Sequence, residues 1–283
     1  MHNEEQIAYW NGDAGRKWAQ KDDVMSTLLA PIARDLMAHC DPAGARALLD
    51  VGCGGGSETV LLAERAGAPG RVLGVDVSRP LLEVAERRRA GAGAIAERIA
   101  FLEADAASHR FEAGGYDFLF SRFGVMFFAD PPAAFGNLRG ALAPGARLAF
   151  ACWQRLEDNP WTLLPLQAAL EHLPAPPAPA PDAPGPFAFA DPDRVRRLLA
   201  AAGFTAIAIE HHPVTMVWGG NGDLAGSVRA LLNMGPVGRL LAEHDEAARD
   251  RVYGNAERVL APYFENGALR LPGATWFVTA RNP

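Results

Sequence analysis

A glycine-rich turn is the part of the sequence that most clearly indicates chemistry. Residues 50–57 read DVGCGGGS; they begin within a short apolar run over residues 47–51 and precede a helical pattern near Val60. Because glycine lacks a side chain, the backbone of such a turn can touch a ligand directly. The turn predicts a ligand site at a strand-to-helix junction, and a tight turn without a ligand is the alternative.

Two acidic residues after later apolar runs narrow the choice of ligand. Asp76 ends a run over residues 71–76, and Asp105 follows a run over residues 99–103. A carboxylate at the end of the second strand can accept both hydroxyls of a ribose, which indicates a nucleoside. Asp105 is placed to accept from an adenine amino group. Helix capping is the alternative for each of the two acids.

The spacing of the glycines distinguishes between the kinds of nucleoside ligand that such a turn can bind. A dinucleotide fingerprint needs G-x-G-x-x-G, but its third glycine would fall at Ser57 or Thr59. A phosphate-binding P-loop needs Gly-Lys-Ser/Thr after the glycines, and the sequence lacks it. The register that fits is G-x-G-x-G, at Gly52, Gly54 and Gly56.

The elements that must position these residues alternate between strands and helices. Apolar runs predict seven strands, at residues 47–51, 71–76, 99–103, 116–121, 147–152, 205–211 and 275–280. Apolar strands that alternate with helices form a parallel sheet covered on both faces. Ligands of such a sheet lie at the carboxyl ends of the strands. We therefore predict an α/β, doubly wound fold with its site at that edge.

Further segments frame the predicted sheet. Apolar residues repeat at helical spacing between Met25 and Leu36, and a proline-rich stretch over residues 174–186 predicts a semi-rigid connector. Residues 212–273 hold two helical patterns before the last strand. The predicted domains are an N-terminal helical cap over residues 1–45, a ligand-binding domain over 46–211 and 274–283, and a helical insertion over 212–273 that forms a substrate lid.

Composition and charge exclude several classes of protein. The chain has 283 residues and a formal net charge of -6, which argues against a nucleic acid partner. Three cysteines without C-x-x-C spacing predict no metal site and fit a cytoplasmic protein. The polar N-terminus does not resemble a secretory signal, and no apolar run is long enough for a membrane span. A homo-oligomer is compatible with the sequence, which does not specify the oligomeric state.

In combination, five segments resemble the class I S-adenosylmethionine-dependent methyltransferases. They are residues 50–56, 74–78, 103–106, 117–121 and 142–149. In detail the chain is similar to the small-molecule group that includes the ubiquinone and menaquinone methyltransferases. The resemblance is strong over about residues 46–152 and weak over the last two strands. It implies a Rossmann-like, seven-stranded, mostly parallel sheet with an antiparallel last strand, and S-adenosyl-L-methionine as cofactor.

The resemblance also implies residues that hold the cofactor. They are Asp50, Gly52, Gly54, Gly56, Asp76, Val77, Asp105, Ala106 and Ser121, joined by Trp18 from an N-terminal aromatic segment. In this family the glycines would face the methionine half and Asp76 would hold the ribose. Asp105 and Ala106 would meet the adenine edge, while Ser121 would lie beside the reacting methyl group.

Aromatic and apolar residues predict where the methyl acceptor binds. The candidates are Trp10, Phe123, Met126, Phe127 and Trp153. They favour a flat or hydrophobic small molecule, and packing in the core is the alternative. An acceptor that must lose a proton needs a base. His109, His211 and His212 are candidates for the base, and we assign none of them as catalytic.

These observations predict an enzyme. It is a methyltransferase that moves a methyl group from S-adenosyl-L-methionine to an oxygen, nitrogen or carbon atom of a hydrophobic or aromatic small molecule by direct displacement. The alternatives are an RNA or protein methyltransferase, or a non-catalytic module that binds the cofactor. The sequence does not distinguish O-, N- and C-methylation.

Overall fold

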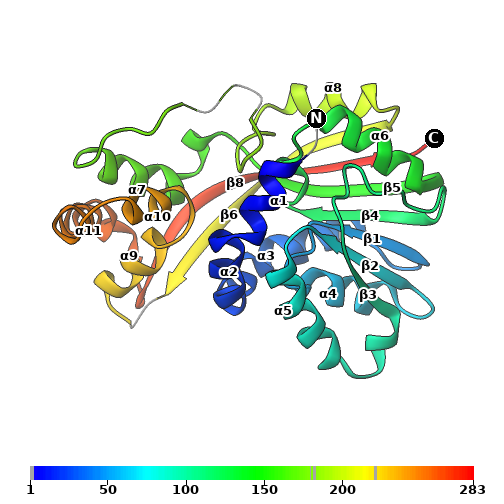
Figure 1. Cartoon of the computed structure of the whole chain (residues 1–283), viewed down its shortest axis with the longest axis horizontal. Helices are drawn as coiled ribbons and strands as arrows, with labels where there is room; N and C mark the ends of the chain where they lie inside the picture. Colours follow the sequence, from blue (N-terminus) through cyan, green and yellow to red (C-terminus); the bar gives the residue numbers. More distant parts are fainter. Residues whose placement is uncertain (1–2, 179, 181–182, 220–221) are drawn as a thin grey trace. The chain divides into compact units, whose positions relative to one another are not determined.

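The central sheet of the computed structural model is built from the apolar runs that predict strands. The structure describes residues 3–178, 180, 183–219 and 222–283. Five strands pair in parallel: β1 (Ala47–Val51), β2 (Arg71–Asp76), β3 (Ile99–Glu103), β4 (Tyr116–Arg122) and β5 (Leu142–Trp153). With β6 (Thr205–Gly219) and β8 (Ala268–Arg281), the order across the sheet is β3-β2-β1-β4-β5-β8-β6 (Figure 1). The predicted α/β fold with a mostly parallel sheet is confirmed.

The strand order reverses between β1 and β4. After β1 the chain adds β2 and β3 on one side, and it then returns to add β4 and β5 on the other side. In an open parallel sheet, ligands bind at the carboxyl ends of the strands where the order reverses. The glycine turn follows β1, and Phe123 follows β4. The fold therefore brings these two predicted site segments to the same edge.

Helices cover both faces of the sheet, as a doubly wound fold requires. Packing contacts join α3 to α4 and α4 to α5 on one face, and α6 to α8 on the other (Figure 1). Their bounds are α3 (Asp22–Cys40), α4 (Ser57–Ala66), α5 (Arg79–Ala90), α6 (Pro131–Ala141) and α8 (Pro192–Ala201), and α1 (Glu4–Asn11) and α2 (Asp13–Gln20) precede them. The predicted N-terminal helices are confirmed, since α3 buries Met25, Leu29, Ile32 and Leu36.

An aromatic core holds β4 and β5, the two strands that lead to the predicted substrate residues Phe123 and Trp153. Phe118 and Phe120 of β4 and Phe150 of β5 are fully buried. Phe135 of α6 lies 5.9 Å from Phe150, measured between ring centroids. Buried aromatic side chains contribute large apolar areas and prefer such offset or edge contacts. This packing holds the carboxyl ends of β4 and β5 in place.

The last two long strands extend beyond their predicted ends. β6 continues to Gly219 instead of ending at residue 211, and β8 begins at Ala268 instead of residue 275. Pro213 and Pro272 favour strand ends at these places in the sequence, because proline cannot donate a hydrogen bond to a sheet ladder. β6 tolerates Pro213 since it is the edge strand of the order. The short β7 (Phe264–Glu265) pairs antiparallel with β8, so the described part of the chain forms a sheet of eight strands, where seven were predicted.

The chain divides into two compact units. The first comprises Met1–Trp153, Asp182–His211 and Trp276–Pro283, and the second comprises Gln154–Pro181 and His212–Thr275. The helices of the second unit are α7 (Pro160–Leu170), α9 (Leu224–Leu232), α10 (Gly235–Ala242) and α11 (Glu246–Leu260). The assignment of residues 212–273 as a substrate lid stays a prediction.

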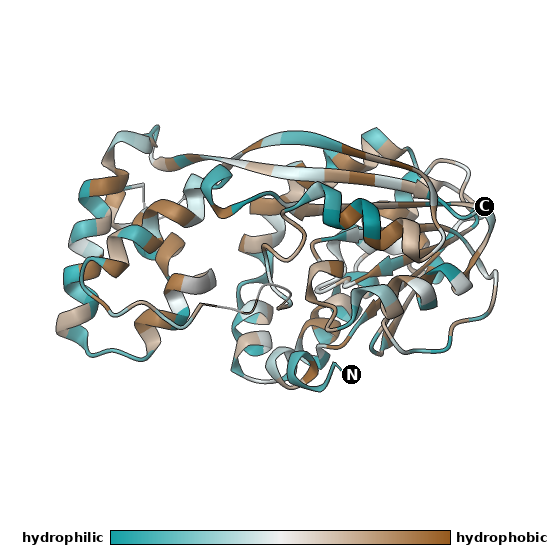
Figure 2. Ribbon diagram, turned by 90° about the horizontal axis from the view of Figure 1, so that it is seen from above, coloured by the Kyte–Doolittle hydropathy of each residue, from teal (hydrophilic) through white to brown (hydrophobic). Residues whose placement is uncertain are grey.

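Within the second unit, the segment after β5 packs with the helical insertion. Asn255 of α11 donates a hydrogen bond of 3.0 Å to the carbonyl of Ala168 in α7. Hydrophilic and hydrophobic residues alternate along the helices of both units, as amphipathic helices require (Figure 2). No helix in the described ranges combines the length and the apolar character needed to cross a membrane.

Candidate active site

Among the three glycines of the G-x-G-x-G register, one faces open space and two lie against other parts of the protein. Gly52, Gly54 and Gly56 have φ angles of 70°, 53° and 77°, in the left-handed region. A Cβ at Gly52 would lie 2.6 Å from the Cα of Gly124, and one at Gly56 would lie 2.6 Å from the Phe101 ring. A Cβ at Gly54 would meet no atom within 4 Å. The outer glycines are therefore needed for packing, and Gly54 is where a ligand can approach the backbone.

Asp76 joins the glycine turn to the turn after β2. Its Oδ2 accepts a hydrogen bond of 2.8 Å from the amide of Gly54, and its Oδ1 accepts one of 2.8 Å from the amide of Ser78. Burial raises the pKa of Asp76, and these backbone N–H groups oppose the shift. An ionised carboxylate offers about four lone-pair sites. Sites therefore remain on both oxygens for the two hydroxyls of a ribose.

Asp50 lies underneath the glycine turn and is 1% exposed. The Thr59 hydroxyl donates a hydrogen bond of 2.6 Å to its Oδ2, which joins β1 to α4. Burial raises the pKa of Asp50 to about 7. The predicted cofactor contact of Asp50 stays a prediction; the observed hydrogen bond with Thr59 indicates a structural acid.

A buried ion pair lies beside Asp50, and sequence reasoning missed it. Arg122 contacts the carboxylate of Glu58 through its Nε at 2.9 Å and its Nη2 at 3.0 Å. Burial would raise the pKa of Glu58, but the guanidinium of Arg122 outweighs it and the pKa is lowered. The pair links the first turn of α4 to the end of β4. The residues are 64 positions apart, so only the folded sheet shows the contact.

Ser121 is fully buried at the end of β4. Its hydroxyl donates a hydrogen bond of 2.7 Å to the carbonyl of Val51 and accepts one of 3.2 Å from the amide of Gly124. These bonds hold the ends of β1 and β4 together. The hydroxyl is thus engaged by backbone groups, and a direct contact between Ser121 and the cofactor stays a prediction.

Two groups of aromatic rings join the segment after β4 to other elements, one to the end of β5 and one to the N-terminal helices. The ring of Phe123 stacks on Trp153, with centroids 4.4 Å apart and planes inclined by 8°. Trp10 makes edge contacts with Phe127 at 5.4 Å and with Trp18 at 5.9 Å. The structure therefore brings four of the five predicted substrate residues into two ring contacts. The fifth candidate, Met126, is 1% exposed and belongs to the core.

The backbone of Phe123 is strained. Its φ angle is 66°, in the left-handed region that side chains other than glycine rarely occupy. Its amide donates a hydrogen bond of 3.1 Å to the carbonyl of Ala151, which fixes this conformation. Backbone strain of this kind persists only where the surroundings determine it, and it clusters at functional sites. The strain marks the segment after Ser121 as a candidate substrate wall.

The segment after β3 contains the two predicted adenine contacts. Asp105 accepts a hydrogen bond of 3.0 Å from the amide of Ala107 and one of 3.2 Å from the Ser108 hydroxyl, so it caps its own turn. Ala106 is 5% exposed. Its carbonyl accepts a hydrogen bond of 3.0 Å from Asn137. The predicted roles of Asp105, Ala106 and Val77 toward adenine stay predictions.

The three histidines considered as bases have other contacts. The ring of His109 packs edge-on against Phe111, with centroids 4.7 Å apart. The ring of His211 lies 6.3 Å from that of Trp276. The carbonyl of His212 accepts a hydrogen bond of 3.1 Å from Thr275. These contacts give no reason to assign any of them as catalytic.

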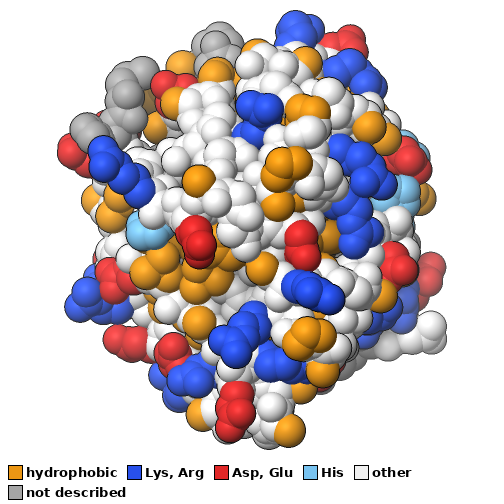
Figure 3. All heavy atoms as spheres, turned by 90° about the vertical axis from the view of Figure 1, so that its right-hand side faces the viewer, with side chains coloured by type: hydrophobic (Ala, Val, Ile, Leu, Met, Phe, Trp, Pro, Cys, Tyr) orange, Lys and Arg blue, Asp and Glu red, His pale blue; other side chains and the backbone are white. Residues whose placement is uncertain are grey.

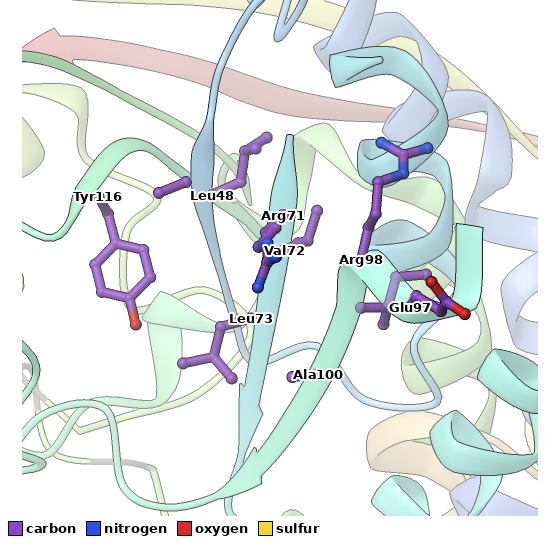
Figure 4. Close-up of a pocket in the computed structure, with 10 residues that line it drawn as sticks. Leu48, Arg71, Val72, Leu73, Glu97, Arg98, Ala100 and Tyr116 are labelled. Carbon is purple, nitrogen blue, oxygen red and sulfur yellow. The ribbon is translucent and has the colours of Figure 1, made fainter. Parts of the chain in front are cut away.

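A separate hollow lies at the opposite edge of the sheet (Figure 4). Its lining includes Ala47, Arg71, Ile99 and Tyr116, which are the first residues of β1, β2, β3 and β4. The carboxyl ends of parallel strands, not their amino ends, form the ligand edge of this fold. The hollow is therefore not part of the candidate site.

Sequence comparisons find similarity to methyltransferases. Residues 49–150 match the family described as methyltransferase domain. The chain is 34% identical over 42% of its length to nocamycin O-methyltransferase of Saccharothrix syringae, covering 41% of that protein. It is 30% identical over 51% of its length to aklanonic acid methyltransferase DauC of Streptomyces sp. (strain C5), covering 67% of it. The demethylmenaquinone methyltransferase of Thermus thermophilus is 40% identical, over 36% of this chain and 44% of that protein.

Solved structures share the fold at low sequence identity. The [4+2]-cyclase SpnF superimposes with a TM-score of 0.54 at 19% identity, over 89% of this chain and 81% of that chain. Phosphoethanolamine N-methyltransferase 2 of Haemonchus contortus gives a TM-score of 0.50 at 18% identity, over 85% and 49% of the two chains. The chain spans less than half of the nocamycin and demethylmenaquinone enzymes and 67% of the aklanonic acid enzyme. The chain belongs to the class I S-adenosylmethionine-dependent methyltransferases.

Proposed function

We propose that the chain transfers a methyl group from S-adenosyl-L-methionine to an oxygen, nitrogen or carbon atom of a hydrophobic or aromatic small molecule. The observation that carries this proposal is the pairing of Gly54 with Asp76. Gly54 faces open space, and its amide donates a hydrogen bond to the Asp76 carboxylate. That carboxylate keeps acceptor sites for the hydroxyls of a ribose. A backbone cradle beside a carboxylate is what a nucleoside needs.

The residues present fit the cofactor. The open space before Gly54 admits a ligand to the backbone, and Asp76 offers the carboxylate for the ribose. Val77, Asp105 and Ala106 would face the adenine, and Trp18 would cover it. When bound, the cofactor supplies a methyl group activated by its sulfonium.

This chain's own residues would orient the acceptor and exclude water. The stacked pair Phe123–Trp153, only 9% and 5% exposed, and the edge contact Trp10–Phe127 would form rigid apolar walls. Displacement of a methyl group needs the attacking atom in line and close, and rigid walls supply that alignment. The ion pair of Glu58 with Arg122, which directly precedes Phe123, holds the wall in position. We assign no general base.

The names of the relatives support a flat, apolar acceptor. They are methyltransferases named for nocamycin, aklanonic acid and demethylmenaquinone. A net charge of -6 argues against an RNA acceptor. On the face drawn in Figure 3, basic and acidic side chains are intermixed and form no basic field. We propose a small molecule as the partner of this site and the cytoplasm as its location, where the free thiols of Cys40, Cys53 and Cys152 stay reduced.

A transfer assay tests the proposed function. The protein is incubated with S-adenosyl-L-methionine carrying a labelled methyl group and a panel of hydroxylated naphthoquinones, anthraquinones and simple phenols, with an RNA and a protein mixture as further acceptors. We expect label in at least one aromatic small molecule. Label in RNA or protein alone would support the alternative methyltransferases. Cofactor binding without transfer to any acceptor would support the non-catalytic module.

A further inference from the structure

The last residue of α1 is bonded to the turn that follows Asp76. The Asn11 amide donates a hydrogen bond of 2.7 Å to the carbonyl of Val77 and accepts one of 3.0 Å from the amide of Arg79. Between them, the Ser78 hydroxyl donates one of 2.7 Å to the carbonyl of Trp10. Three successive residues of this turn are therefore held by α1. Asp76, which directly precedes them, is fixed from the other side by Gly54.

The first residue of α3 is joined to the glycine turn through an arginine of α5. Nη2 of Arg88 lies 2.6 Å from Oδ2 of Asp22, and Nη1 of Arg88 donates to the carbonyl of Gly55. The two charged side chains are only 22% and 12% exposed, so solvent screens the pair weakly. A Cβ on Gly55 would collide with the Asp22 carboxylate, so α3 begins directly on the turn.

We propose that Asn11 and Arg88 are positioning residues that set how long the cofactor stays bound. Asn11 joins the N-terminal helices to the turn after Asp76, and Arg88 joins them to the turn around Gly54. Both residues act through the turns that would hold the cofactor. The inference rests on the proposed function, because it assigns the cofactor to these two turns.

The physical reason is preorganisation. Arg88 fixes the direction of the Gly55 carbonyl with a charge-assisted hydrogen bond, and such bonds are stronger than neutral ones. Asn11 satisfies one backbone acceptor and one backbone donor at once. Without these bonds the turns sample more conformations, and binding must then order them again. Affinity differences between related complexes appear mostly in the dissociation rate. Loss of either residue should therefore speed cofactor release.

The first test measures release of S-adenosyl-L-homocysteine and S-adenosyl-L-methionine by stopped flow, with the intrinsic tryptophan fluorescence of the protein as the signal. Asn11→Ala and Arg88→Ala should dissociate about 10- to 100-fold faster, while association changes little. Arg88→Lys keeps the charge but not the forked geometry, so it should recover part of the loss. With the cofactor saturating, kcat should stay near that of the wild type while KM for the cofactor rises.

Arg89→Ala is the matched control, because Arg89 follows on the same helix and pairs with Glu86 at the surface, at 2.7 Å. It should release the cofactor at the wild-type rate. A second measurement uses no ligand: amide hydrogen exchange over residues 52–56 should speed up in Arg88→Ala and not in Arg89→Ala. If Arg88→Ala does not fold, Asn11→Asp, which loses one donor from a part-buried side chain, takes its place with residues 77–79 as the reporter.

Unchanged release and unchanged exchange in folded Asn11 and Arg88 variants would overturn the inference and leave the proposed function intact. A wild-type protein that binds neither form of the cofactor would overturn the proposed function, and the positioning of the cofactor by Asn11 and Arg88 with it. Faster release in Arg89→Ala as well would also contradict the inference, because a general loss of helix stability would then explain the result.

Discussion

At the scale of single residues, three neighbouring acids differ in what their carboxylates contact. Asp50 accepts a hydrogen bond from Thr59, Glu58 forms an ion pair with Arg122, and Asp76 accepts hydrogen bonds from two backbone N–H groups. Position after a predicted strand was enough to single out Asp76 as a candidate. The sequence could not reveal that Glu58 meets Arg122, because this contact exists only once β1 and β4 pair. Ser121 was found by position, yet its hydroxyl is directed to backbone groups.

We predict that Asp76→Ala weakens S-adenosyl-L-methionine binding by about 10- to 100-fold, measured by isothermal titration calorimetry. The physical reason is the loss of charged hydrogen bonds worth about 1.5–3 kcal/mol. Glu83→Ala, which removes an exposed carboxylate from α5, serves as the control. Equal affinity in Asp76→Ala and the control would contradict the assignment of Asp76 to the ribose.

The buried Asp50 predicts a pH dependence of stability. Its pKa is about 7 in the folded protein, against an ordinary value of 3.8. Because the folded state holds this proton more tightly, the stability that Asp50 contributes is present below pH 4 and is lost as the pH rises to 7. Relative to Asp50→Asn, the free energy of unfolding of the wild type should fall across this window by up to about 4 kcal/mol. Urea unfolding at several pH values measures it, and parallel curves for the two proteins would refute it.

At the scale of elements, the five-residue glycine turn combines packing positions with one position that is open to a ligand. Gly52 and Gly56 are needed where Gly124 and Phe101 approach, and Gly54 is open. The G-x-G-x-G register could be read from the sequence, but which glycine serves which purpose could not. That distinction depends on neighbours that other strands and helices bring to the turn.

We predict that Gly54→Ala and Gly52→Ala fail in different ways. Gly54→Ala costs about 1 kcal/mol of stability, from the left-handed backbone alone, and lowers cofactor affinity tenfold or more because the methyl group fills the ligand space. Gly52→Ala adds overpacking against Gly124 and costs a further 1–3 kcal/mol or so. Thermal unfolding and calorimetry measure the two effects.

Gly44→Ala is the matched control for Gly54→Ala. Gly44 has a φ angle of 78° and open space around its Cβ position, but it lies in the turn before β1. The control should lose a similar amount of stability and keep cofactor affinity. If Gly44→Ala also lost affinity, backbone strain rather than ligand space would explain the effect at Gly54.

The strands illustrate how far local pattern reaches. The first three strands could be predicted because their apolar runs end in glycine or acidic residues, and β4 and β5 could be predicted from apolar runs alone, although β5 begins at Leu142 instead of residue 147. The far end of β6 and the start of β8 could not be predicted, because Pro213 and Pro272 interrupt the apolar pattern. In the folded protein, pairing with neighbouring strands continues both strands through these prolines. Met216 and Trp218 alternate as buried residues along β6 beyond the predicted end.

At the scale of the whole molecule, the chain forms two units that are not continuous in sequence. The second unit joins residues 154–181 with residues 212–275. Asn159 holds parts of it together: its amide nitrogen donates to the carbonyls of Arg155 and Ala274, and its oxygen accepts from Trp161 and the amide of Ala274. Ala274 is 115 positions from Asn159. A pattern read within short windows cannot reveal such a contact.

We predict that Asn159→Ala destabilises the second unit by about 2–4 kcal/mol, because several buried backbone groups lose their partners. Hydrogen exchange should accelerate over residues 160–170 and 268–275, while cofactor affinity changes by less than about threefold. Asn233→Ala, which removes an exposed contact with Tyr253 in the same unit, is the control. If Asn159→Ala lost as much cofactor affinity as Asp76→Ala, the result would contradict the prediction that Asn159 stabilises the second unit and does not hold the cofactor.

Titration of the wild-type protein with S-adenosyl-L-methionine in a calorimeter tests the central claim most directly. The claim is that the Gly54 backbone and the Asp76 carboxylate form a site for a nucleoside that carries a methyl sulfonium. We expect saturable binding of one molecule per chain, and competition by S-adenosyl-L-homocysteine. No heat with either ligand, together with saturable binding of a nicotinamide dinucleotide, would contradict the account.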